Sequence, residues 1–132
     1  MRVLITGAAG MIGRKLTAAL ISRGTLQGRP ISQMILQDIV AAEVAAPHVA
    51  LVGDLSVPGV ATGLIAHRPE VIFHLAGVVS GEAEANFDLG YRVNVDGTRA
   101  LFEAIRLAEY APRLVYASTT AVFGGPFPEE IP

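Results

Sequence analysis

Three glycines near the start of the chain constrain its possible folds more than any other feature. Gly7, Gly10 and Gly13 follow a short β-branched run and open a stretch with helical spacing. In a strand–turn–helix unit, the first glycine permits a tight turn, the second lets the backbone approach a pyrophosphate, and the third allows close packing of the helix. Free N–H groups and the helix dipole then favour phosphate. The spacing therefore predicts a dinucleotide-binding loop, and the alternative interpretation is a flexible turn.

Five short apolar runs recur along the chain, and each is followed by a longer Ala- or Leu-rich stretch. The runs are nearly continuous, which is typical of a parallel sheet covered on both faces. Helical spacing occurs in Met11–Arg23, Val60–Ala66 and Tyr91–Glu109. This alternation predicts an α/β fold with a doubly wound parallel sheet and right-handed crossovers. The predicted strands are Val3–Thr6, Met34–Leu36, Val49–Val52, Val71–Leu75 and Leu114–Ala117.

Composition excludes several classes of protein. Of the 132 residues, 52% are hydrophobic and the net charge is −2, which argues against disorder and against a basic surface for nucleic acid. There is no cysteine for a disulfide or a Cys-type metal site, and no His or carboxylate pair has metal-ligand spacing. The apolar run Val71–Val79 is too short to span a membrane, and the first residues lack a signal-peptide pattern. We therefore expect a cytoplasmic protein with no metal, nucleic-acid or membrane partner.

Two aspartates follow predicted strands at the sheet edge that carries the glycine loop. A carboxylate at Asp38 can accept hydrogen bonds from the hydroxyls of an adenosine ribose and would repel a 2′-phosphate, which favours NAD over NADP. Asp54 could accept a hydrogen bond from the adenine amino group while Leu55 packs against the ring. The alternatives are a loop-capping Asp38 and an ordinary Gly-Asp turn. Arg14, directly after the third glycine, keeps NADP as an alternative cofactor.

Four motifs in order, across essentially the whole chain, resemble those of the extended short-chain dehydrogenase/reductase family, which includes sugar-nucleotide epimerases and dehydratases. They are Thr6–Gly13 in the pattern TGxxGxxG, His74–Gly77 on the fourth strand, Asn94–Thr98 in the long helix, and Tyr116–Gly124 at the fifth strand. Within that family, the stretch from Val78 to Thr98 looks most like the branch that oxidises the 2-hydroxyl of D-erythronate, a four-carbon sugar acid, with NAD. The resemblance implies a Rossmann-type fold and this activity.

The resemblance also implies roles for particular residues. Met11 and Ile12 would offer backbone N–H groups to the pyrophosphate, and Asn94 would face the cofactor from the long helix. Thr119 falls at the position of the family's catalytic Ser or Thr, where its hydroxyl would hold the reacting carbon near the nicotinamide. The expected substrate contacts are Ser80, Thr119 and Thr120. The expected cofactor-binding residues are Gly7, Gly10, Met11, Ile12, Gly13, Asp38, Asp54, Leu55, Leu75, Ala76, Gly77 and Asn94.

Other polar residues have less specific patterns. His74 lies in the most apolar strand, where a buried and hydrogen-bonded histidine is expected rather than a base or a ligand. Glu82, Glu84 and Asp88 form an acidic stretch that we expect to be a loop. Solvation is the favoured interpretation of the two glutamates, because acidic side chains would not attract an anionic substrate. The alternative is a lid on the substrate side, with Ser80 touching the sugar acid.

The acid–base pair of the family is a tyrosine followed four residues later by a lysine, and this chain lacks it. None of its three tyrosines has a lysine at that spacing, because Lys15 is the only lysine. We therefore expect residues 1–132 to be an incomplete NAD-binding domain, without a substrate domain and with negligible turnover. The alternatives are a nucleotide-sugar epimerase or dehydratase of the same family and a non-catalytic dinucleotide-sensing module. A homodimer through the helix around Tyr91 to Glu109 is also expected.

Overall fold

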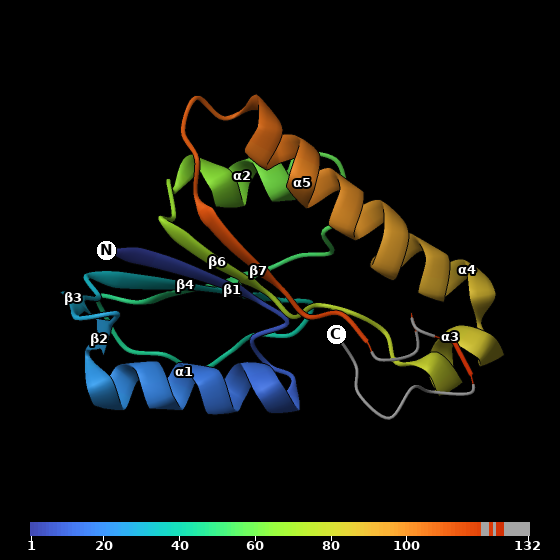
Figure 1. The fold of residues 1–132 in the computed structure, drawn as a ribbon, viewed down its shortest axis with the longest axis horizontal. Helices are drawn as coiled ribbons and strands as arrows, with labels where there is room; N and C mark the ends of the chain where they lie inside the picture. Colours follow the sequence, from blue (N-terminus) through green and yellow to red (C-terminus); the bar gives the residue numbers. More distant parts are fainter. Residues whose placement is uncertain (120–121, 123, 126–132) are drawn as a thin grey trace.

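A computed structural model, which describes residues 1–119, 122, 124 and 125, shows a twisted parallel sheet between two layers of helices (Figure 1). The predicted α/β class and doubly wound sheet are confirmed. The strand order is β5-β4-β1-β6-β7, so the order reverses beside β1, where open α/β sheets bind their ligands. The strands of this sheet are β1 Arg2–Thr6, β4 Gln33–Asp38, β5 Val49–Val52, β6 Val71–His74 and β7 Arg113–Tyr116.

Each face of the sheet has its own apolar core. Alternate residues of a strand point to opposite faces, so Val3 and Ile5 pack toward α1 (Met11–Arg23) while Leu4 packs toward the opposite layer. That layer contains α2 (Val60–Ala66) and α5 (Thr98–Leu107), as Figure 1 shows. Burial on both faces explains why β1 and β4 are continuously apolar, whereas the edge strands β5 and β7 are partly exposed. The bounds predicted for the first two helices are confirmed.

The long helix differs from the predicted Tyr91–Glu109. It begins earlier, as α4 (Phe87–Tyr91), continues through a π-helical segment η1 (Arg92–Gly97), and ends in α5 at Leu107. The earlier start has a local cause, because the Asn86 side chain accepts a hydrogen bond of 3.0 Å from the backbone N–H of Leu89 and so caps the helix. Apolar periodicity alone does not reveal such a cap.

The acidic stretch expected to be a loop is also different. Residues Ser80–Ala85 form a short helix, α3, and Asp88 lies in the first turn of α4. The two helices pack tightly, since a Cβ added at Gly90 would come within 2.6 Å of the Ala83 Cβ. Small residues at this contact therefore stabilise a helix that has no apolar stripe of its own.

A small hairpin, β2 (Thr25–Leu26) with β3 (Arg29–Pro30), was not predicted. Its turn residues Gln27 and Gly28 both have positive φ, as a type I′ hairpin turn requires. Gln-Gly is a weaker turn signal than Asn-Gly or Asp-Gly, which explains the omission. Across the described part of the chain, every helix falls short of the length and apolar content that a membrane span needs.

The buried histidine is confirmed, and it joins three elements. His74 is 1% exposed, with Nδ1 2.7 Å from the Thr6 hydroxyl and Nε2 2.9 Å from the Thr98 hydroxyl. The Thr6 hydroxyl also accepts a hydrogen bond of 3.3 Å from the Ala76 N–H, so its own proton is available to Nδ1. Burial lowers the pKa of His74 to about 4. The imidazole is therefore neutral at pH 7 and links β1, β6 and α5.

This burial predicts that stability falls as the pH drops from 6.5 to about 4, because His74 takes up a proton in that window only when the chain unfolds. The full loss should be roughly 3 kcal/mol, and urea titrations at intervals of pH would measure it. A His67→Gln control should keep the loss, whereas His74→Gln should reduce it. A wild-type stability that stays constant between about pH 6.5 and 5 would contradict the prediction.

Candidate functional site

A cavity of about 410 Å³ lies at the carboxyl ends of the strands, where the strand order reverses. One wall comes from the glycine loop and the ends of β4 and β5, and the other from the segment after β6 with α3, α4 and η1. Eight of the expected cofactor-binding residues line it. These are Gly7, Gly10, Asp38, Asp54, Leu55, Leu75, Ala76 and Gly77.

The glycine loop is packed too closely for side chains. Gly7 has φ 70°, and a Cβ there would lie 2.7 Å from the backbone of Leu75 and Ala76. A Cβ at Gly13 would overlap the carbonyl oxygen of Gly7, so the third glycine allows α1 to begin directly against the loop. The loop is also closed by a hydrogen bond of 3.1 Å from Gly10 N–H to that carbonyl. The result is a bare backbone surface at the start of α1.

Asp38 both caps this loop and lines the cavity. Its Oδ2 accepts a hydrogen bond of 2.9 Å from the Ala9 N–H, and its Oδ1 accepts one of 2.7 Å from the Ile39 N–H. The loop-capping interpretation therefore describes part of its role. A carboxylate has about four lone-pair positions, so two remain for another donor in the cavity.

Asp54 is fixed by a turn of its own. Its Oδ1 accepts hydrogen bonds from Ser56, of 2.8 Å from the N–H and 2.7 Å from the hydroxyl. The hydroxyl bond lowers the pKa of the Asp54 carboxyl below its usual range, and the Ser56 N–H and the charge of Arg92 act in the same direction against the opposing effect of burial. Gly53, the residue before Asp54, is held in turn by Gln37, whose amide nitrogen donates a hydrogen bond of 2.5 Å to the Gly53 carbonyl. The turn at Asp54 has a local sign in the sequence, because an aspartate two residues before a serine favours such a turn, whereas the contacts of Gln37 and Arg92 come from distant parts of the chain.

The opposite wall is held through its backbone. The Asn94 amide forms two hydrogen bonds with the backbone of Val78. Its oxygen accepts a hydrogen bond of 2.8 Å from the Val78 N–H, and its nitrogen donates one of 3.0 Å to the Val78 carbonyl. Two residues earlier, the Ala76 N–H donates to the Thr6 hydroxyl. The expected role of Asn94 at the cofactor stays a prediction, and in the structure its amide holds this wall. The side chains of Leu89 and Val93, which line the cavity, form one apolar pair at i, i+4 that periodicity could have found.

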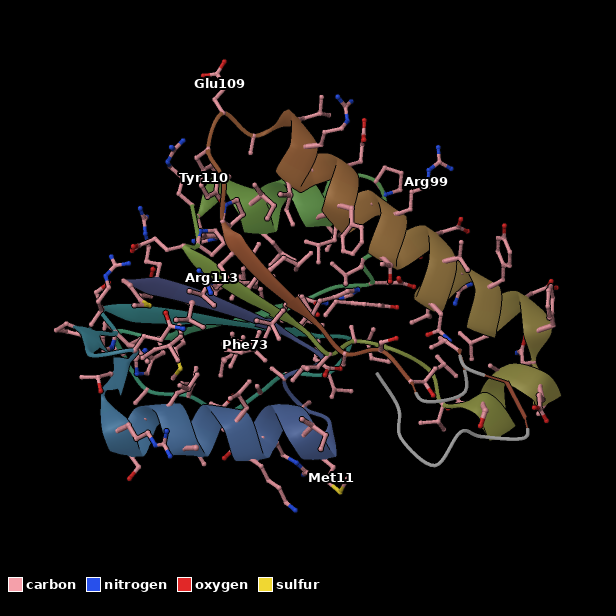
Figure 2. The ribbon with its side chains drawn as sticks, viewed as in Figure 1. Met11, Phe73, Arg99, Glu109, Tyr110 and Arg113 are labelled. Atoms are coloured by element: carbon pink, nitrogen blue, oxygen red, sulfur yellow. The ribbon has the colours of Figure 1, made fainter. Side chains whose placement is uncertain are left out.

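The remaining expected residues lie elsewhere in the structure. Met11 and Ile12 form the first turn of α1 with exposed side chains, and Figure 2 shows Met11 at the end of that helix. Their N–H groups are among those that a helix leaves without an intrahelical acceptor. Ser80 begins α3, Thr119 follows β7 with an exposed side chain, and Thr120 lies outside the described residues. Within the described residues, the lining does not include Met11, Ile12, Gly13, Ser80, Asn94 or Thr119.

Glu82 differs from the favoured interpretation of a solvated loop residue, because it lies on α3 and lines the cavity although its side chain is exposed. In the described ranges, no three His, Asp or Glu side chains lie close enough together to hold a metal ion. The groups gathered at the cavity are instead two carboxylates, bare backbone and an apolar lining. Such a set can accept hydrogen bonds from hydroxyl and amino groups beside an anion at the loop.

Known proteins resemble this chain over almost its whole length. Residues 3–132 match the model of the NAD dependent epimerase/dehydratase family. The D-erythronate dehydrogenase of Cupriavidus necator is 46% identical over 97% of this chain and 41% of the relative. A solved nucleoside-diphosphate-sugar epimerase from Agrobacterium tumefaciens is 51% identical, with a TM-score of 0.90 over 97% of this chain and 40% of that one. A mutant of uronate dehydrogenase from the same species, solved in complex with NAD, is 28% identical, with a TM-score of 0.74 over 89% of this chain and 40% of that one.

The chain thus spans about two fifths of the length of the relatives that it matches. The residues that match the family model, 3–132, include the glycine loop and every residue that lines the cavity.

The packing of Gly7 leads to a prediction about stability. Gly7→Ala should destabilise the chain by about 1–3 kcal/mol more than Gly24→Ala, because both glycines have positive φ but only Gly7 has backbone atoms within 4 Å of the added Cβ. The Gly24 change carries only the left-handed backbone cost of about 1–2 kcal/mol. Urea unfolding of the two variants measures the difference, and equal losses would contradict the tight contact.

Proposed function

Because the chain belongs to the NAD-dependent epimerase/dehydratase family, we propose that it is the NAD-binding part of an oxidoreductase acting on a small sugar acid. The reaction would be oxidation of the 2-hydroxyl of a D-erythronate-like substrate, as the name of the Cupriavidus relative suggests. The observation that carries the proposal is the cavity at the strand-order reversal, with the glycine loop at one side and two carboxylates beside it. Activity and substrate are proposed for the whole protein.

The groups around the cavity fit each part of a dinucleotide. The bare backbone at Gly7 and Gly10 leaves room for a pyrophosphate, and the first N–H groups of α1 are positioned to donate to it. Asp38 offers acceptors for ribose hydroxyls, and Asp54 offers one for an amino group, with Leu55 as an apolar neighbour. When bound, NAD supplies the acceptor for the hydride. The Leu75–Gly77 segment would border its nicotinamide half.

One observation favours NAD over NADP. The Asp38 carboxylate lines the cavity, where it would repel a second phosphate on the ribose. Arg14, which could favour NADP, lines a neighbouring hollow that shares Ala9 and Val40 with the main cavity. NADP therefore stays the alternative cofactor.

The substrate end rests on Thr119 and its neighbours. We propose that the Thr119 hydroxyl donates a hydrogen bond to the substrate oxygen, with Ser80 and Thr120 as further contacts. The proton of the reacting alcohol needs an acceptor, and the Tyr–Lys pair that serves the family is not among these 132 residues. We therefore expect the isolated chain to bind the cofactor with negligible turnover.

The alternative reaction is epimerisation of a nucleotide sugar. It is favoured by the solved structure at 51% identity, which is described as a nucleoside-diphosphate-sugar epimerase. Both reactions use the same cofactor half, so the binding groups described above serve either. Assays of the whole protein with D-erythronate and with a nucleotide sugar would separate them.

Calorimetric titration of the purified chain with NAD⁺ and NADP⁺ tests the cofactor assignment. We expect saturable binding of NAD⁺ and at least about tenfold weaker binding of NADP⁺, because of the like charges at Asp38. Asp38→Asn should reduce the ratio of the NAD⁺ affinity to the NADP⁺ affinity, because it removes the negative charge. Glu109→Gln, the same chemical change at the far end of the molecule (Figure 2), should leave the ratio unchanged. Absence of NAD⁺ binding would contradict the proposal.

We also propose that two copies of the chain pair through the long helix. Phe87, Tyr91 and Val95 recur at helical spacing and are 72%, 52% and 43% exposed, and Phe102 continues the apolar surface. Such a stripe can pack against its own copy about a two-fold axis. Light scattering should give the mass of a dimer, and Val95→Glu should shift it toward the monomer. A wild-type monomer at high concentration would contradict this pairing.

A further inference from the structure

An ion pair joins the two walls of the cavity. Arg92 is the first residue of η1, and its Nε lies 3.6 Å from Oδ2 of Asp54 at the end of β5. Asp54 lines the cavity, and so do Leu89 and Val93, which flank Arg92 on the helix. The guanidinium therefore reaches from the helical wall to the sheet wall at the Asp54 side of the cavity.

The two oxygens of Asp54 have different surroundings. Oδ1 accepts both hydrogen bonds from Ser56, so this side of the carboxylate is fixed to its own turn. Oδ2 faces Arg92. The Asp54 and Arg92 side chains are 27% and 56% exposed, and a pair this exposed adds little to folding stability. Its main effect is on the direction and charge of the carboxylate.

The π-helical segment η1 begins at Arg92 and contacts the same turn at its other end. Gly97, at the other end of η1, is buried, and a Cβ there would lie 3.3 Å from the Leu55 Cβ and 3.6 Å from the Ser56 N. The same segment thus contacts the turn at residues 54–56 through a glycine and through Arg92. A π-turn inserts one residue into a helix and often occurs at functional sites.

We propose that Arg92 is a positioning residue that sets the purine specificity of the cofactor site, by holding Asp54 so that Oδ2 accepts a hydrogen bond from the exocyclic amino group of adenine. The inference rests on the proposed function, since it takes Asp54 as the adenine contact. A carboxylate oxygen only accepts hydrogen bonds. It matches the amino group at C6 of adenine and opposes the carbonyl at C6 of hypoxanthine.

The test compares NAD⁺ with nicotinamide hypoxanthine dinucleotide, which carries a carbonyl in place of the C6 amino group and, with it, an N1–H donor in place of the N1 acceptor. Calorimetry on the purified chain should show preference for NAD⁺, and Arg92→Gln should reduce the ratio of the two affinities up to about fivefold, the range of an exposed ion pair. Arg92→Lys should restore part of the preference because it keeps the charge. Arg99→Gln is the matched control, since Figure 2 shows Arg99 on the same long helix pointing away from the sheet.

A second readout needs no cofactor. In NMR titrations of the free chain, Arg92→Gln should raise the pKa of the Asp54 carboxyl, because the charge of Arg92 helps to lower it. Arg99→Gln should not change that pKa.

The outcomes separate this inference from the proposed function. If Arg92→Gln binds NAD⁺ with an unchanged preference over the hypoxanthine analogue, the inference is wrong and the proposed function stands. Tighter binding of NAD⁺ by Arg92→Gln would also overturn it, since Arg92 would then compete for Oδ2. If the wild-type chain does not bind NAD⁺, both the proposed function and this inference fail.

Discussion

The backbone of Gly7 packs against the backbone of Leu75 and Ala76, and the gap between them is too small for one side-chain carbon. This contact joins the end of β1 to the end of β6, on the two sides of the strand-order reversal. The cavity lies at that junction. Because the contact is between main-chain atoms, it sets the distance between the glycine loop and the opposite wall independently of side-chain packing.

Polar groups then hold each wall in place. Thr6 and Asn94 bind the backbone of the segment after β6, and Gln37 and Ser56 hold the turn that carries Asp54. All four side chains are at least partly removed from water, where hydrogen bonds are more directional and unpaired groups more costly. The buried, neutral His74 continues this network into the core between β6 and α5.

The features that could be predicted from sequence are those with strong local signals. The central strands β1 and β4 are apolar because both of their faces are covered, and the glycine loop has a spacing that few other structures need. The supports of the site could not be predicted in this way. Arg92 and Asn94 both lie in the π-helical segment, which the spacing of apolar residues does not predict. Helix α3 depends on the close contact of Ala83 with Gly90 rather than on apolar periodicity. Such contacts join residues far apart in sequence or depend on backbone geometry that no motif specifies.

The anchoring of the Leu75–Val78 wall through main-chain atoms has a consequence for how the site can diversify. Since Thr6 and Asn94 bind main-chain N–H and carbonyl groups, they hold this segment without using its side chains. The side chain of Val78 can therefore change in size and polarity without breaking either hydrogen bond to Asn94, whereas a Cβ at Gly77 would lie 3.3 Å from the Asn94 amide oxygen. A wall built this way can change the chemistry of the cavity by a single substitution, while the backbone behind it stays the same.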